Sequence, residues 1–255
     1  MILRHINSRG ALWFGFFGLI LAAWAGVFAM VLSSPVAGIP ASAWSTLCTS
    51  AAAASRSALF AMWALMSAAM MLPTFVPALG TFLNLGAAGA TKPSEALALV
   101  AGYASIWLIG AGLGAMAQHQ LTVWGLLAPD GSSLSRWLIA ALLLAAGLYQ
   151  FSLFKAACLA KCRMPLTFFM ERWAPGAPRA FRMGLELGAL CFGCCWALMA
   201  LAFIGGTMSL LWMGAATLFM VLEKLPDLGR PLTRPAGFVL NTAAGIVALR
   251  AALGS

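Results

Sequence analysis

The chain has 255 residues, of which 63% are hydrophobic and only 8% are charged, and its formal net charge is +9. A water-soluble globular domain carries roughly 25% charged residues, so this composition excludes that class of protein. The basic residues are spread between apolar runs rather than gathered on one face. This distribution argues against nucleic acid as a partner and in favour of a lipid bilayer.

Seven apolar segments come close to the roughly 20 residues that a helix needs to cross the hydrocarbon of a membrane. In chain order they cover residues 12–32, 57–79, 96–117, 134–154, 183–204, 208–222 and 236–253. None alternates as a barrel strand does, and a lipid-spanning backbone must otherwise be helical. The sequence therefore predicts an all-α fold, one polytopic membrane domain of about seven transmembrane helices over residues 1–255. The first segment has full spanning length, so we expect it to be a retained signal anchor.

Charge on the connecting segments sets the expected orientation. If the N-terminus lies in the cytoplasm, all of the 15 Lys and Arg residues except Arg56, Arg136 and Arg250 fall on the cytoplasmic side. This is the asymmetry of the positive-inside rule. We therefore expect a multi-pass protein of the bacterial inner (cytoplasmic) membrane whose C-terminus faces the periplasm. Its most basic connection is a cytoplasmic loop over residues 155–182.

Five of the cysteines fall into two tight groups. The first group is Cys158 and Cys162, whose i, i+4 spacing places both sulfur atoms on one face of a helix. Neighbouring Lys155, Lys161 and Arg163 favour the thiolate form of cysteine, and cytoplasmic thiols stay reduced. The pair is therefore a candidate for metal or redox chemistry, with a plain helix end as the alternative.

The second group, Cys191, Cys194 and Cys195, lies inside the fifth apolar segment, with Cys194 near its midpoint. Cys191 and Cys195 share a helix face, and Met199 continues that face one turn further. Soft thiolate and thioether ligands select Cu(I) over hard ions, so this stripe predicts a metal site within the membrane. Cysteine also packs as a small hydrophobe, so burial alone is the alternative.

A methionine stripe occupies the second apolar segment at the same expected depth as Cys194. Met62, Met66 and Met70 follow one another at i, i+4 spacing, and Met66 and Met70 are candidate ligands. Pro73 removes a helical hydrogen bond, and freed backbone at membrane depth often lines a cavity. Core packing is the alternative here too, because methionine readily fills gaps.

Two acidic residues are candidates for function because charge is costly inside a membrane. Glu186 lies one turn inside the fifth segment and is expected to pair with Arg182 at i, i−4. Glu223, which precedes Lys224 at the end of the sixth segment, is expected either to anchor the membrane interface or to pair with a basic residue of the inner loop. The sequence contains no phosphate loop, dinucleotide fingerprint or His-Glu-x-x-His motif. It therefore favours a binding or transfer role over an enzymatic one.

Two long stretches resemble a bacterial family of unknown function that is labelled predicted metal-binding integral membrane proteins. The first comprises residues 62–73 and, further on, 149–165, and the second comprises residues 184–199 and 206–224. The similarity spans roughly residues 57–245. It implies that the cysteines of both groups are family positions, namely Cys158, Cys162, Cys191, Cys194 and Cys195. It implies no particular reaction, substrate or partner.

The leading hypothesis is a membrane protein that binds and handles a soft metal ion, Cu(I), for transport, storage or delivery to a metalloenzyme. Zinc is the less favoured metal, and a metallochaperone or the subunits of a membrane complex are the expected partners. The two cysteine groups should lie roughly 21 Å apart in depth, which predicts a relay of two sites. One alternative is a transmembrane thiol–disulfide electron carrier. Another is a non-catalytic accessory subunit of a larger membrane complex.

Overall fold

The structure is a computed structural model that describes residues 2–32, 55–87, 92–128, 131–207 and 209–253. Within these ranges every named element is an α-helix, and an isolated β-bridge joins Leu127 to Ser133. The predicted all-α class is therefore confirmed. Cys48 lies outside the described residues.

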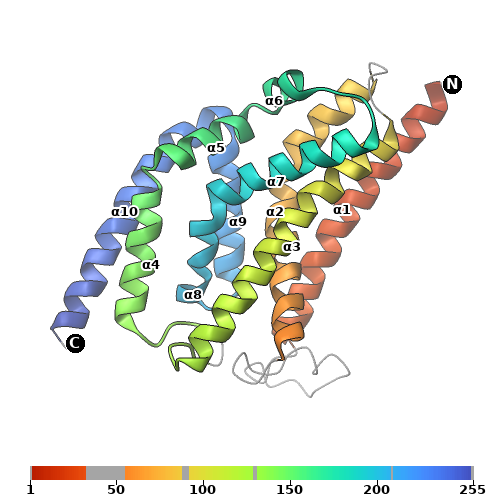
Figure 1. The fold of residues 1–255 in the computed structure, drawn as a ribbon. Coiled ribbons are helices and arrows are strands. Elements are labelled where there is room, and N and C mark those ends of the chain that lie inside the picture. Colours follow the sequence, from red (N-terminus) through yellow and green to blue (C-terminus); the bar gives the residue numbers. More distant parts are fainter. Residues whose placement is uncertain (1, 33–54, 88–91, 129–130, 208, 254–255) are drawn as a thin grey trace.

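A helix is present in each of the seven predicted segments, and further helices connect them (Figure 1). They are α1 Ile2–Leu32, α2 Arg56–Ala87, α3 Pro93–Val123, α4 Arg136–Tyr149, α5 Leu153–Arg163, α6 Pro165–Arg172, α7 Ala177–Ala200, α8 Ala202–Gly205, α9 Leu210–Lys224 and α10 Pro226–Ala252. Pro73 and Pro77 lie within α2 without dividing it. The break in the backbone that was expected at Pro73 is therefore absent, and α2 continues through this residue.

Five helical segments of the described chain are long and apolar enough to cross a membrane, namely α1, α2, α3, α7 with α8, and α10. Helices α4 and α5 pass the same test together, but they are bent by 63° at a short break. They are therefore a broken span or a re-entrant segment. Helix α9 has 15 residues, fewer than the roughly 20 that a perpendicular span requires. The prediction of several membrane-spanning helices thus agrees with the fold, and five or six of them meet the criteria of length and composition.

The bend between α4 and α5 follows from a local capping signal. Helix α4 ends at Tyr149, and the side chain of Ser152 then accepts a hydrogen bond from the backbone N–H of Phe154 at 3.1 Å. A serine at this position satisfies backbone donors that a new helix leaves free, so it starts α5 in a new direction. Pro165 occupies the first position of α6, where its missing N–H costs nothing.

The stretch predicted as a basic cytoplasmic loop, residues 155–182, is therefore mostly helical. It contains most of α5, all of α6 and the first residues of α7. Charge and proline content suggested a loop, but the capping serine and the N-terminal prolines instead begin short helices there. This difference matters for the site, because α5 packs against α7.

Close helix packing in the centre of the fold depends on glycine. Helices α3 and α7 cross where a Cβ on Gly102 would overlap the carbonyl oxygen of Phe181, and one on Gly184 would overlap that of Leu99. Small residues allow such close approach of two backbones within a membrane. On the other side of the bundle, α4 and α10 lie side by side as a second pair (Figure 1).

Candidate metal centre

The three cysteines of α7 form a buried group of thiols. Cys191, Cys194 and Cys195 are each at most 2% exposed, and all are free of disulfides. The Sγ atoms of Cys194 and Cys195 lie 3.3 Å apart, and the Cys194 thiol donates to the backbone carbonyl of Cys191 at 3.1 Å. The α7 helix alone thus places three soft sulfur side chains close to one another in a buried environment.

Helix α5 brings the other cysteine pair to the same place. The side chain of Cys162 lies close to that of Cys194. The Sγ atom of Cys158 lies only 3.0 Å from the position that a Cβ would take on Gly193. Across the same contact, the hydroxyl of Tyr149 donates to the carbonyl oxygen of Gly193.

The predicted separation of roughly 21 Å between the two cysteine groups is therefore wrong. That prediction assumed that Cys158 and Cys162 lie beyond the end of a straight fourth span, at the membrane surface. The 63° bend between α4 and α5 instead folds α5 back against α7. The two groups therefore lie close together. Their five residues are called the sulfur cluster below, namely Cys158, Cys162, Cys191, Cys194 and Cys195.

Three polar side chains from other helices converge on Cys191. The ammonium of Lys224, at the end of α9, lies 2.9 Å from the Cys191 Sγ atom and donates to the Thr74 hydroxyl of α2 at 2.8 Å. The hydroxyl of Tyr103, from α3, lies 3.0 Å from the same sulfur. Both hydroxyls are also within reach of the Met71 carbonyl, at 2.8 Å for Thr74 and 3.1 Å for Tyr103. Cys191 is thus surrounded by polar groups from α2, α3 and α9.

Sequence reasoning did not assign these three residues to the site. Tyr103 and Thr74 each carry one hydroxyl group and lie inside apolar segments, where the sequence around them forms no motif. Lys224 stands out in the sequence only because it follows Glu223. A lysine at the end of an apolar segment is usually an interfacial residue that extends toward water. The one available signal was the cost of a charge within a span, which makes any such residue a functional candidate.

A buried ion pair supports the cluster from the side of α5. The ammonium of Lys155 lies 2.9 Å from a carboxylate oxygen of Glu223, and both side chains are 1% exposed. Arg163 donates from Nε to the backbone carbonyl of Glu223 at 2.9 Å. The expected pairing of Glu223 with a basic residue of the inner stretch is confirmed. Lys155, expected to act on the nearby thiols, bonds to this carboxylate instead.

The predicted pairing of Glu186 with Arg182 is also confirmed. Their closest atoms are 3.5 Å apart, and Arg172 of α6 makes a shorter contact of 2.8 Å to the same carboxylate. All three side chains are partly exposed, so these pairs are not part of the buried cluster. Each of these two ion pairs contributes at most about 1 kcal/mol to the stability of the fold.

The candidate methionines are buried, with Met66 at 2%, Met70 at 3% and Met199 at 7% exposure. The residue of α2 that reaches the cysteines is Thr74, whose hydroxyl lies 3.9 Å from the Cys191 sulfur. Thr74 lies one helical turn beyond Met70. The role of these methionines as metal ligands stays a prediction.

The thiols meet in pairs rather than as a finished polydentate cage. Among the described residues, no group of three or more His, Cys, Asp or Glu side chains is arranged to hold a metal ion. A structural zinc site is a closed tetrahedron of four ligands, and this arrangement does not provide one. Soft Cu(I) favours thiolate and thioether donors, so adjacent sulfur atoms suit it better. Loading of the cluster would require the thiols to rearrange around the ion.

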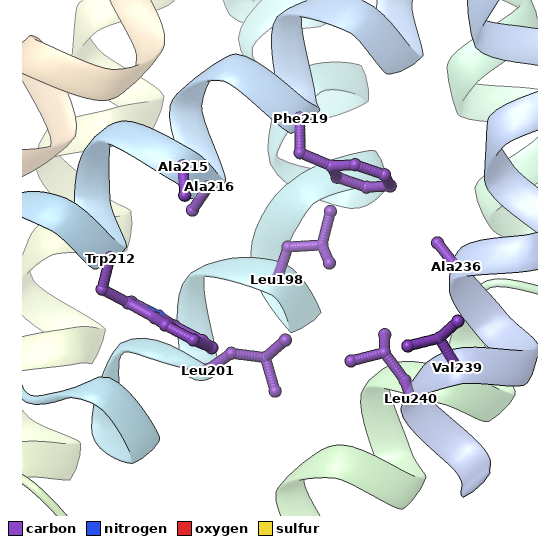
Figure 2. A pocket seen from close by; sticks show the side chains of 9 residues that line it. All are labelled: Leu198, Leu201, Trp212, Ala215, Ala216, Phe219, Ala236, Val239 and Leu240. Carbon is purple, nitrogen blue, oxygen red and sulfur yellow. The ribbon is translucent and has the colours of Figure 1, made fainter. Parts of the chain in front are cut away.

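A pocket of about 200 Å³ lies next to the bundle core but is chemically unlike the sulfur cluster. Figure 2 shows apolar side chains from α7, α9 and α10 lining it, among them Leu198, Trp212, Phe219 and Leu240. None of its lining residues carries sulfur or a charge. It therefore offers no ligands for a metal ion.

Comparison with known proteins identifies the family. The family model described as "PpoB2: Copper chaperone" matches residues 60–247, a range that contains every residue of the sulfur cluster. No curated protein and no solved structure matches the chain. The match agrees with the predicted metal-binding family and supports copper handling in general. Because it covers well over half of the sequence, the chain belongs to the PpoB2 copper chaperone family.

Proposed function

We propose that this protein carries Cu(I) as cargo in the sulfur cluster and delivers it to a metalloenzyme or membrane complex. The observation that carries the proposal is the packing of α5 against α7, which brings Cys158 and Cys162 close to the three cysteines of α7. Thiolates bind soft monovalent copper strongly and exchange it by stepwise replacement of one sulfur by another. A cluster drawn from two helices can change its set of ligands when one helix moves.

The proposed ligands are the cysteines of both helices. Cys191, Cys194 and Cys195 hold the ion on α7, and Cys162 completes the set from α5, with Cys158 one turn away. Met199, one turn beyond Cys195, and Met66 and Met70 of α2 serve as weaker thioether ligands. The surrounding core is buried and largely apolar, which limits the access of water and oxidants to Cu(I).

The proposed location is the bacterial inner membrane, with the N-terminus in the cytoplasm and the C-terminus in the periplasm. In support, the N-terminal end of α1 lies at the same end of the bundle as α5 and α6, and the C-terminal end of α10 lies at the opposite end (Figure 1). Counting α9 and the bent α4–α5 pair as spans gives the proposed total of seven. Copper would then exchange at the cytoplasmic end, near α5, with a metallochaperone as donor or acceptor.

The test is the metal content of the purified protein. Protein prepared anaerobically in detergent and loaded with Cu(I) should retain about one copper per chain after desalting, measured by plasma mass spectrometry. The variant Cys191→Ser/Cys194→Ser/Cys195→Ser should retain almost none, because hydroxyl oxygen is a poor ligand for a soft ion. Cys48→Ser, outside the family match, is the matched control and should keep the copper.

Three results would contradict the proposal. A well-folded wild type that retains no copper overturns the proposal, and a reversible disulfide in that protein would favour the thiol–disulfide carrier instead. Equal copper in the wild type and the triple variant would place the metal elsewhere. Zinc retained in place of copper would indicate a closed structural site.

A second prediction distinguishes one cluster from a relay of two sites. In a single cluster, Cys162→Ser should weaken Cu(I) retention by the α7 cysteines about tenfold or more, because Cys162 lies close to Cys194 and would share the ion with it. In a relay, the α7 site would bind copper independently of α5. The measurement is competition with a chromophoric Cu(I) chelator. An unchanged affinity in Cys162→Ser would exclude the single cluster.

A further inference from the structure

The charge of Lys224 is buried, and no carboxylate of the described residues lies within salt-bridge distance of it. The side chain is 8% exposed, and its ammonium contacts the Thr74 hydroxyl at 2.8 Å and the Cys191 sulfur at 2.9 Å. The other deeply buried lysine, Lys155, is neutralised by Glu223 at 2.9 Å. A buried ammonium is costly unless a negative charge lies nearby. For Lys224 the nearest group that can carry one is the thiolate of Cys191.

The position of Lys224 does not depend on the cysteine alone. It is the last residue of α9, and Thr74 holds its ammonium while also bonding to the Met71 carbonyl. The ammonium is therefore anchored by α2 and directed at the sulfur of α7. A fixed charge of this kind retains its place when the cluster binds or releases an ion, and so it acts on the cargo electrostatically.

The electrostatic effect of Lys224 depends on the valence of the ion. For any given set of cysteine ligands, a site that holds a divalent ion carries one more positive charge than the same site with a monovalent ion. The ammonium of Lys224 adds a fixed positive charge beside the ligand Cys191, and like charges repel strongly in a buried site. The same lysine therefore disfavours a divalent cargo relative to a monovalent one.

We infer that Lys224 is a specificity-determining residue that makes the sulfur cluster select monovalent over divalent soft ions. This inference rests on the proposed copper-carrying function and adds the basis of its selectivity. Lys224 acts through charge and not as a ligand, since a lysine ammonium has no free electron pair to donate. Arg163 lies near Cys194 as well, but its Nε and Nη2 atoms are bonded to the Glu223 carbonyl and Thr233.

The experiment compares Cu(I) with Cd(II), two thiophilic ions that differ in charge. Affinities are measured at fixed pH under anaerobic conditions, by chelator competition, for the wild type, Lys224→Met and Lys224→Arg. Methionine keeps the length of the side chain and removes its charge, whereas arginine keeps the charge. Lys92→Met, an exposed lysine just before α3, is the control for the same loss of net charge.

Unequal shifts are expected for the two ions. Lys224→Met should bind Cu(I) about tenfold to a hundredfold more weakly, since hydrogen bonds to charged groups contribute about that factor. Its affinity for Cd(II) should fall much less, because removal of the lysine also removes its stronger repulsion of the divalent ion, so the ratio of Cu(I) to Cd(II) affinity should fall. Lys224→Arg should retain the preference for Cu(I), and Lys92→Met should change neither affinity. If Lys224→Met does not fold, Lys224→Gln, which keeps a donor without charge, takes its place.

Several outcomes would overturn the inference without touching the proposed function. Suppose that the wild type binds Cu(I) and that Lys224→Met has the same ratio of Cu(I) to Cd(II) affinity as the wild type. This result would exclude selection by the charge of Lys224. Equal weakening of both ions would mean that Lys224 only supports the structure. A wild type that binds no Cu(I) at all would instead overturn the proposed function and the inference together.

Discussion

Replacing Lys155 with methionine should lower the free energy of unfolding by about 3–5 kcal/mol. Lys155 and Glu223 are both 1% exposed, and their charged atoms are 2.9 Å apart. Removal of the lysine leaves the carboxylate of Glu223 buried without its counter-charge. One of its oxygens, Oε1, already lacks a hydrogen-bond partner in the described structure, so no alternative protein donor is in place. Reversible unfolding in mixed micelles of dodecyl maltoside and SDS measures the effect.

The matched control removes both charges together. Lys155→Met/Glu223→Gln leaves no unpaired ion, so it should be less destabilised than Lys155→Met alone. A double variant that loses as much stability as the sum of the two single variants would show that the ion pair is not coupled. The pair also connects α5 to α9, so Lys155→Met should weaken Cu(I) retention by loosening the contact of Cys162 with α7.

Replacing Gly184 with alanine should be about as damaging, with a loss of roughly 3 kcal/mol at the upper end of overpacking effects. The new Cβ would overlap the carbonyl oxygen of Leu99, a backbone atom that moves only if the helix moves with it. Helices α3 and α7 would have to separate. Separation also withdraws Tyr103 from the Cys191 sulfur, now 3.0 Å away, so Cu(I) affinity should fall together with stability.

Gly245→Ala in α10 is the control for this substitution. A Cβ at Gly245 meets no atom within 4 Å, so alanine there should be neutral or slightly stabilising through its higher helix propensity. The same unfolding assay and chelator competition apply to both variants. Wild-type stability in Gly184→Ala would mean that α3 and α7 do not cross as closely as described.

The sequence alone determined the helical class and the chemistry available to the protein. In lipid, the backbone N–H and C=O groups of an apolar run can form hydrogen bonds only with one another. Helices at these positions therefore follow from local hydrogen bonding. The i, i+4 spacing correctly placed Cys191 and Cys195 on one helix, and the cost of buried charge correctly paired Glu223 with a basic residue. Composition and spacing are local properties, and both predictions required nothing more.

The tertiary structure decided which residues share a site. A hydropathy pattern does not show in which direction the chain leaves a helix. The bend at Ser152 turns α5 toward α7, so Cys162 lies close to Cys194 instead of at the expected distance from it. The convergence of Tyr103 and Lys224 on one cysteine depends on how α3 and α9 pack against α7. Such contacts join residues far apart in sequence, because side-chain packing and charge compensation act through space and not along the chain.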